Sequence, residues 1–335
     1  MQLRLAIKVL LCAAGFLLWP GPAEAIPLFH MTTNRTELIR AEHKHHWWKV
    51  IRPKKKTPAE QLAYSERLVE RGRLRSASSA FRALVYTWPE SPEAPRAQLK
   101  FAELLDRRKR YADAFEEYQF LIQYYPGHFA YNDVIRRQYE LALMTVSWRR
   151  GFLFIRWRER EKAISMLETM LQNAPHWEKA DEAQYEVGRL YEEMGQEEMA
   201  IMAYAMVQQR YPRSPLAEPA LFNEVRCSYT LTRRYRHSSD LRINAAAMAK
   251  DFLYRHPRSE FSAQARLYLE ELYREQAEAL YRQAQVYERT APSLSSAVMI
   301  YERLITEYPA SLWAQPARAR IEYLKTRMLK EYHEN

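Results

Sequence analysis

Prolines that each follow an aromatic or histidine residue recur along this sequence, and they constrain its fold more than any other feature. The pairs are Trp88-Pro89, Tyr125-Pro126, Tyr211-Pro212, His256-Pro257 and Tyr308-Pro309, with Ala174-Pro175 as a weaker member. Because proline lacks the N–H that continues a helix, each pair predicts the end of a helical unit. Six such stops predict six units, and successive prolines lie 37, 49, 37, 45 and 52 residues apart.

The unit from Asp181 to Pro212 shows the internal pattern most clearly. Its first half carries an i, i+3, i+4, i+7 stripe made of Gln184, Val187, Gly188 and Tyr191. Gly195 then ends that helix, and a second helix repeats the spacing with Ala200, Tyr204 and Val207. Small residues at Gly188 and Ala200 predict a close approach of the two helices. One such hairpin cannot bury its apolar seam alone, so copies of it must stack.

These patterns predict an all-α fold, a right-handed α-solenoid of about six helix hairpins of tetratricopeptide type with a C-terminal capping helix. The shortest separations lie near the ~34-residue tetratricopeptide period, and the longer ones indicate insertions. Only seven glycines occur, and Gly72 and Gly195 hold the same hairpin-turn position. Four stops continue as Pro-x-Ser, and the serines are predicted to N-cap the next helix: Ser91, Ser214, Ser259 and Ser311. Pro92 and Pro215 would then occupy its first turn.

The first two repeats are predicted to run from Pro58 to Pro89 and from about Pro95 to Pro126. The third restates the pattern at Gln138 and resumes its second helix at Ala163, with the insertion SWRRGFLFIRWRER between them. The aromatics of this insertion are interpreted as a lengthened helix or loop packed on the stack, or alternatively as an exposed anchor for a partner.

The fifth and sixth repeats are predicted to share one long helix. In the fifth repeat Arg226 stands where a small residue is expected, and RRYRHSSDLRIN lengthens the turn. An uninterrupted helical pattern then runs from Ser259 to about Arg289, long enough to serve both repeats. A last helix from Trp313 to about Leu329 is predicted to cap the stack, because a terminal layer must present one polar side to water.

The N-terminus has the pattern of a secretory signal peptide. Arg4 and Lys8 precede the apolar run VLLCAAGFLLW, and an A-x-A motif predicts signal cleavage after Ala25. The predicted organisation is signal peptide 1–25, basic arm 26–57, repeat domain 58–329 and tail 330–335. Export predicts a periplasmic protein. Cys227 is then the one cysteine of the exported chain, and its predicted role is packing.

The net charge of +10 is concentrated at the N-terminus. Residues 1–57 hold ten Lys/Arg against three acids, a surplus of +7, which leaves +3 for the rest. A nearly balanced repeat array argues against nucleic-acid binding. The arm suits anionic lipid headgroups, acidic envelope polymers or an acidic patch on a partner, and a solvated linker is the alternative.

Catalytic and cofactor motifs were sought in the sequence. It contains no GxxxxGK[ST], GxSxG, HExxH or paired CxxC, so no catalytic residue, cofactor or metal is predicted. The histidines His30, His43, His45 and His46 resemble a metal site, but His45 and His46 are adjacent and no scaffold fixes them. A solvated tail is the preferred interpretation.

The surface predicted to bind a partner is the face of the first helices. Positions off the seam are expected to line a groove there, and the candidates are Leu99, Lys100, Glu103, Tyr185, Arg189 and Glu192. Their mixture of aromatic, aliphatic and charged groups suits an extended peptide better than an enclosed small substrate. The alternative is a solvated face without a ligand.

Three segments resemble the BamD (YfiO) family of periplasmic tetratricopeptide proteins. They are YPRSP at Tyr211, HPRSEFSAQARLYLEELYREQAEALYRQAQVYE at His256, and SLSSAVMIYERLITEYPASLWAQPARARIEYL at Ser293. The resemblance covers roughly residues 58–329. It implies a non-enzymatic scaffold in the periplasm, peripheral at the inner face of the outer membrane, that helps outer-membrane barrel proteins to insert. Its N-terminal repeats would meet unfolded barrel proteins, and its C-terminal repeats the periplasmic domains of the insertase.

Two features depart from that family. No cysteine stands near Ala25 to carry a lipid, so the basic arm is a candidate replacement for the lipid as the means of attachment. In addition, six hairpins are predicted where five are usual. A periplasmic adaptor for peptidoglycan or cell-division enzymes is the alternative function. An enzyme is a third hypothesis, which would require a polar cluster in one pocket.

Overall fold

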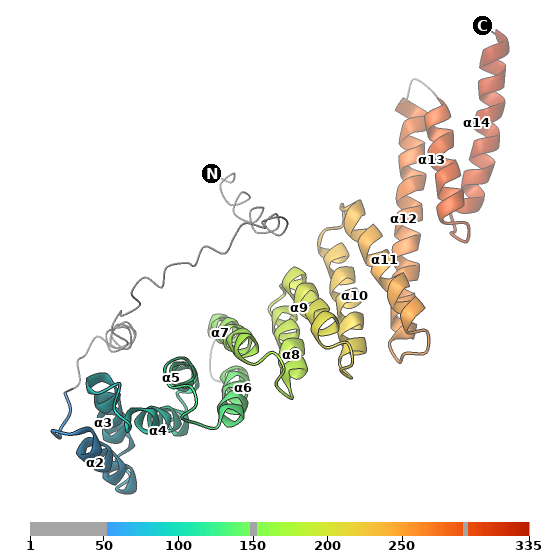
Figure 1. Ribbon diagram of the computed structural model, residues 1–335. Coiled ribbons are helices and arrows are strands. Elements are labelled where there is room, and N and C mark those ends of the chain that lie inside the picture. Colours follow the sequence, from blue (N-terminus) through green and yellow to red (C-terminus); the bar gives the residue numbers. More distant parts are fainter. Residues whose placement is uncertain (1–51, 148–152, 291–293, 335) are drawn as a thin grey trace, which may run out of the picture.

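The computed structural model describes residues 52–147, 153–290 and 294–334, and these residues form helices without a strand (Figure 1). In chain order the helices are α2 (Pro58–Glu70), α3 (Leu74–Thr87), α4 (Ala94–Arg107), α5 (Tyr111–Tyr124), α6 (Tyr131–Ser147), α7 (Leu153–Asn173), α8 (Ala180–Glu193), α9 (Glu197–Arg210), α10 (Ala217–Arg234), α11 (Ser239–Arg255), α12 (Ser262–Thr290), α13 (Leu294–Glu307) and α14 (Ala314–Glu334). They form six pairs and a last helix, which confirms the predicted all-α solenoid of hairpins.

The helices stack in sequence order, with α2 and α14 at opposite ends (Figure 1). All the extensive helix contacts join neighbours along the chain, and smaller ones join α5 to α7 and α10 to α12. The buried core is accordingly a strip. One continuous cluster runs from Leu68 to Ala203, and another joins the end of α12 to α13 and α14. Each layer is therefore stabilised by the layers beside it.

The turn between paired helices requires a left-handed residue. Gly72 and Gly195 have φ of +69° and +70°, which confirms their predicted equivalence, and Lys109 holds the same position with φ of +58°. In each turn the left-handed residue donates its N–H three residues back: Gly72 to Val69 O, Lys109 to Asp106 O and Gly195 to Glu192 O. Glycine adopts this conformation without strain, so the strain in this turn falls on the lysine.

The seam of the fourth repeat closes around Gly188, as predicted. A Cβ placed on Gly188 would lie 2.7 Å from two ring carbons of Tyr204, and Tyr204 and Ala200 are fully buried. Tyr191 is half-buried against the core. Glycine at this position therefore sets the distance between α8 and α9.

A buried glutamine in the first helix joins the two helices of a repeat. The amide of Gln61 donates to Ala80 O at 3.0 Å, and Gln184 donates to Ala203 O at 3.0 Å. Gln98 donates to the backbone oxygen of Glu117 at 2.9 Å in the second repeat. Each acceptor lies 19 residues after its glutamine. The amide nitrogen of each glutamine is hydrogen-bonded, so its burial costs little.

The aromatic residue before a stop proline links neighbouring repeats. Tyr125 donates its hydroxyl to Pro89 O and Tyr211 donates to Pro175 O, each at 2.9 Å and across 36 residues. The tyrosine before one stop proline thus hydrogen-bonds to the stop proline of the preceding repeat. Tyrosine suits this position because its hydroxyl group reaches that backbone oxygen.

The serines after the stops do not N-cap helices, and that prediction is wrong. Ser214 and Ser259 lie in turns, and each hydroxyl accepts the N–H two residues on, from Leu216 at 3.0 Å and from Phe261 at 3.1 Å. Helices α4, α10, α12 and α14 begin three residues after Ser91, Ser214, Ser259 and Ser311, because each serine carbonyl accepts the N–H of the first helical residue. Pro92 and Pro215 therefore lie in turns, and Pro95 holds the first-turn position of α4.

Helices α7 and α14 differ from their predicted bounds, whereas α12 agrees with its prediction. α7 starts at Leu153 instead of Ala163, so much of the insertion continues the helix. α12 runs for 29 residues and packs on both α11 and α13, which confirms a helix shared by two layers. α14 extends to Glu334, past the predicted end near Leu329.

Several predictions fall on residues outside the described ranges. They concern the signal peptide and cleavage after Ala25, most of the basic arm, the histidine cluster and the start of the insertion between α6 and α7, with Trp148 and Phe152. No helix among the described residues combines the length and apolar character needed to cross a membrane.

Candidate functional site

The first helices of successive pairs contact one another through side chains, and we call this series the first-helix row. Its contacts are Glu66–Arg96 (2.7 Å), Asp106–Arg137 (2.7 Å), Tyr139–Glu182 (3.4 Å), Tyr185–Asn223 (2.8 Å), Glu192–Arg226 (2.8 Å), Tyr229–Glu271 and Glu288–Arg320 (2.9 Å). They join α2, α4, α6, α8, α10, α12 and α14 in order. Polar and aromatic contacts therefore link these helices without a gap from α2 to α14.

Three of the predicted groove residues lie on α4. Leu99 is half-buried against the core, whereas the Lys100 ammonium lies 2.8 Å from a carboxylate oxygen of Glu103. The side chains of this ion pair are 42% and 31% exposed. Lys100 thus offers a charge that a partner can reach, and Leu99 contributes packing.

The other three predicted residues lie on α8. Tyr185 accepts a hydrogen bond from the amide of Asn223 at 2.8 Å, and Arg189 donates to Glu186 at 2.8 Å. Glu192 accepts from Tyr204 at 3.0 Å and from Arg226 at 2.8 and 3.0 Å. The Glu192 carboxylate is therefore committed to joining α8 to α10, while Arg189 remains 44% exposed.

The two groups of predicted residues are separated by α6, so the structure does not bring them together. Between them lie residues that the sequence interpretation missed, Asp106 on α4, Arg137 and Tyr139 on α6, and Glu182 on α8. A signal for Tyr139 was present, because the tripeptide QYE at 138–140 recurs at 184–186 and places Tyr139 in the position of Tyr185. Arg137 has no counterpart in that repeat pattern.

Hydrogen bonding and burial fix the charge states along this surface. The hydrogen bond to Asp106 raises the pKa of Arg137, and the hydrogen bond to Glu186 raises the pKa of Arg189. Burial, and next the charge of Glu182, raise the pKa of Tyr139 to about 12. The arginines stay charged and the tyrosine stays neutral at physiological pH, so the surface presents a constant pattern of charges and hydroxyl groups.

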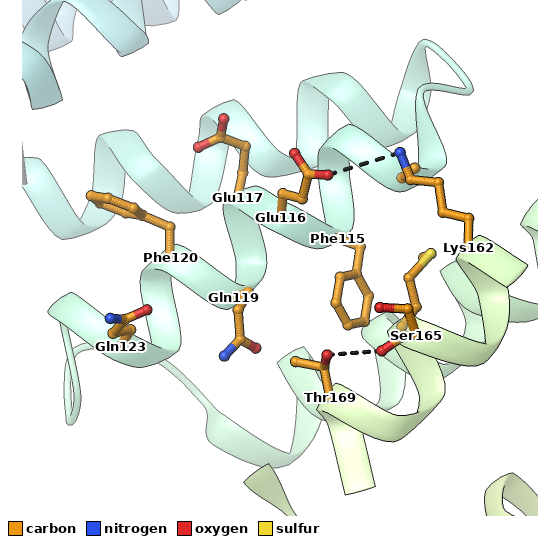
Figure 2. A pocket seen from close by; sticks show the side chains of 11 residues that line it. Phe115, Glu116, Glu117, Gln119, Phe120, Gln123, Lys162, Ser165 and Thr169 are labelled. Atoms are coloured by element: carbon orange, nitrogen blue, oxygen red, sulfur yellow. Dashed lines mark hydrogen bonds and ion pairs between the residues drawn. The ribbon is translucent and has the colours of Figure 1, made fainter. Parts of the chain in front are cut away.

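A separate hollow of about 260 Å³ lies between α5 and α7, both second helices of their pairs (Figure 2). Its apolar lining includes Phe115, Phe120 and Met166, which are buried, and Lys162 lies 3.8 Å from Glu116 at its edge. The predicted groove residues all lie on first helices, so this hollow is a different surface.

Two observations bear on chemistry within the described residues. No group of three histidine, cysteine or carboxylate side chains there could hold a metal ion. Burial raises the pKa of the Cys227 thiol to about 12, and its side chain is 1% exposed. Cys227 is therefore a protonated thiol that packs in the core, in agreement with its predicted role.

Comparisons with known proteins bear on the repeats. Residues 182–214 and 278–311 match the family model described as tetratricopeptide repeat, and no curated protein matches the chain. These segments cover the fourth repeat and the junction of α12 and α13. These two segments of the chain thus have the pattern of tetratricopeptide repeats.

Similar solved structures include MamA protein and two proteins described as tetratricopeptide repeat proteins. MamA protein is 16% identical and aligns over 60% of this chain and 92% of its own, with a TM-score of 0.30. A tetratricopeptide repeat protein from Parabacteroides merdae is 17% identical over 74% and 92%, with a TM-score of 0.28. YrrB, described as a TPR protein with an unusual peptide-binding site, is 13% identical over 68% and 97%, with a TM-score of 0.28.

Proposed function

We propose that this protein is a non-enzymatic scaffold that holds extended segments of other proteins on the first-helix row. The observation that carries the proposal is the continuity of that row, in which cross-helix contacts fix side chains from α2 to α14. A surface whose side chains are already ordered loses little conformational entropy on binding. The first-helix row also extends over several helices, whereas a pocket is confined to a few residues. An extended peptide needs a binding surface of this kind.

The chemistry of the row suits a peptide of mixed charge. On α8, Glu186 and Glu193 surround the exposed guanidinium of Arg189, while Lys100 provides a cation on α4. Tyr139 and Tyr185 add hydroxyl groups and ring surfaces between these charges. A partner with alternating charges and some aromatic or aliphatic side chains would therefore match the row best.

Our more specific proposal concerns place and partner. The export signal supports a periplasmic location, and the resemblance of segments at Tyr211, His256 and Ser293 to the BamD family supports a role in outer-membrane barrel assembly. The partners would be the periplasmic domains of the insertase and unfolded barrel proteins. The basic arm is proposed to attach the protein to an anionic membrane surface.

Photo-crosslinking in intact cells tests both levels of this proposal. A crosslinking amino acid at Lys100 or Arg189 should capture partner proteins, whereas one at Met202, which is 58% exposed on second helix α9, should capture few. Mass spectrometry of the adducts should identify insertase domains and barrel proteins. Peptidoglycan or division enzymes instead would support the adaptor function, and equal capture from Met202 would contradict a role for the first-helix row.

A further inference from the structure

A cavity of about 460 Å³ lies where the lengthened turn between α10 and α11 meets the middle of α12. Its walls carry four arginines, Arg233, Arg236, Arg242 and Arg282, together with His237. Two carboxylates, Glu275 and Glu278, also line it. Four positive and two negative side chains leave the cavity with a surplus of +2.

Two of the arginines are neutralised by these carboxylates. Arg233 pairs with Glu275 and also lies 2.6 Å from Glu271, and Arg282 lies 2.5 Å from Glu278. The first pair joins α10 to α12, and the second lies within α12, where the Arg282 side chain is 73% exposed. The surplus charge of the cavity therefore resides on the side of the α10–α11 turn.

One donor on that side is buried without an acceptor. Arg242 gives one N–H to the backbone oxygen of Arg236 at 2.5 Å, but its Nε is buried and has no partner. Arg236 and His237 are exposed at the mouth of the cavity, where a ligand can reach them. A buried N–H normally has an acceptor, so the unpartnered Nε of Arg242 is a donor that a ligand in the cavity could satisfy.

We propose that this cavity binds a phosphate group. Guanidinium forks match phosphate oxygens, and donors from three side chains suit a tetrahedral anion better than a planar carboxylate. The cavity of about 460 Å³ restricts the ligand to a compact group. The phosphate can come from a small phosphate ester in solution or from a phospholipid headgroup.

Two probes separate these sources. Calorimetric titration of the whole chain with inorganic phosphate measures binding from solution, and co-sedimentation with phosphatidylglycerol or phosphatidylcholine vesicles measures binding to a headgroup. The variants Arg236→Gln and Arg242→Gln should weaken binding roughly tenfold or more, because each removes a charged hydrogen-bond donor. Arg258→Gln, an exposed arginine in the turn after α11, removes the same charge elsewhere and should change binding less than about twofold.

Circular dichroism melting confirms that the variants fold, and Arg236 is exposed, so its replacement should leave stability unchanged. Binding of inorganic phosphate that depends on Arg236 supports a soluble phosphate ester. Binding to anionic vesicles alone, with the same dependence, supports a headgroup. Failure of both probes to bind, or an equal loss with Arg258→Gln, would overturn the proposal.

Discussion

Replacement of Gly188 by alanine tests the close approach of α8 and α9, because two effects of opposite sign compete. Alanine favours a helix over glycine by about 1 kcal/mol. The new Cβ, however, would lie 2.7 Å from Cδ1 and Cε1 of Tyr204, against about 3.5–4.0 Å for carbon atoms in contact. The ring or the helix must therefore move by about 1 Å.

The ring of Tyr204 has little freedom to move. It is fully buried, its centroid lies 5.3 Å from that of Tyr185, and its hydroxyl donates to Glu192 at 3.0 Å. Overpacking of a constrained core costs about 1–3 kcal/mol, and we place this site in the upper half of that range. The net effect of Gly188→Ala should be destabilisation by about 1–2 kcal/mol.

Urea unfolding followed by circular dichroism measures this change. The same substitution made in a Tyr204→Leu background provides the control, because leucine lacks the ring atoms that the new methyl group meets. There Gly188→Ala should be neutral or stabilising by up to about 1 kcal/mol. A stabilising effect of Gly188→Ala in the unmodified chain would refute the packing argument.

Three further predictions concern the turn, a buried acid and the repeat linkage. Lys109→Gly should stabilise the protein by about 1 kcal/mol in urea unfolding because φ is +58°, whereas Gly72→Ala at the equivalent position should destabilise it by a similar amount. Burial raises the pKa of Glu224 to about 7 from 4.5, so the folded state binds the proton more tightly than the unfolded state. The contribution of Glu224 to the free energy of unfolding should be complete below about pH 4.5 and decline by up to about 3 kcal/mol as the pH rises through 7. Glu224→Gln should abolish this part of the pH dependence, and an unchanged pH profile would contradict the prediction. Tyr211→Phe should cost about 1 kcal/mol by removing the bond to Pro175 O, whereas Tyr254→Phe, whose side chain is 87% exposed, should cost nothing measurable.

The repeat architecture could be predicted from the sequence because proline and small residues act locally. A stop proline ends a helix because it lacks an N–H donor, independently of its neighbours. Gly188 opposite Tyr204 allows α8 and α9 to pack at one short distance. The same local reasoning gave the wrong capping role for Ser214, since a serine before a helix can accept an N–H within a turn as readily as at an N-cap. Whether the serine lies in the turn or at the N-cap depends on where the next helix packs against the stack.

The surface was less predictable, because its contacts cross between repeats. Arg137 and Asp106 are 31 residues apart and Glu192 and Arg226 are 34 apart, so neither pair follows from the spacing within one helix. Arg226 appeared as a poor match to the repeat pattern, and its half-exposed side chain instead links α10 to α8. A residue that departs from the repeat pattern, such as Arg226, can thus be explained by a contact with a neighbouring repeat.

Hydrogen exchange of the protein with a captured partner bound tests the central claim most directly. Amide protection should increase on α4, α6, α8 and α10, which carry the first-helix row, and remain unchanged on α5, α7, α9 and α11. New protection confined to the second helices, or distributed equally over both sets, would contradict the claim that partners lie along the first helices.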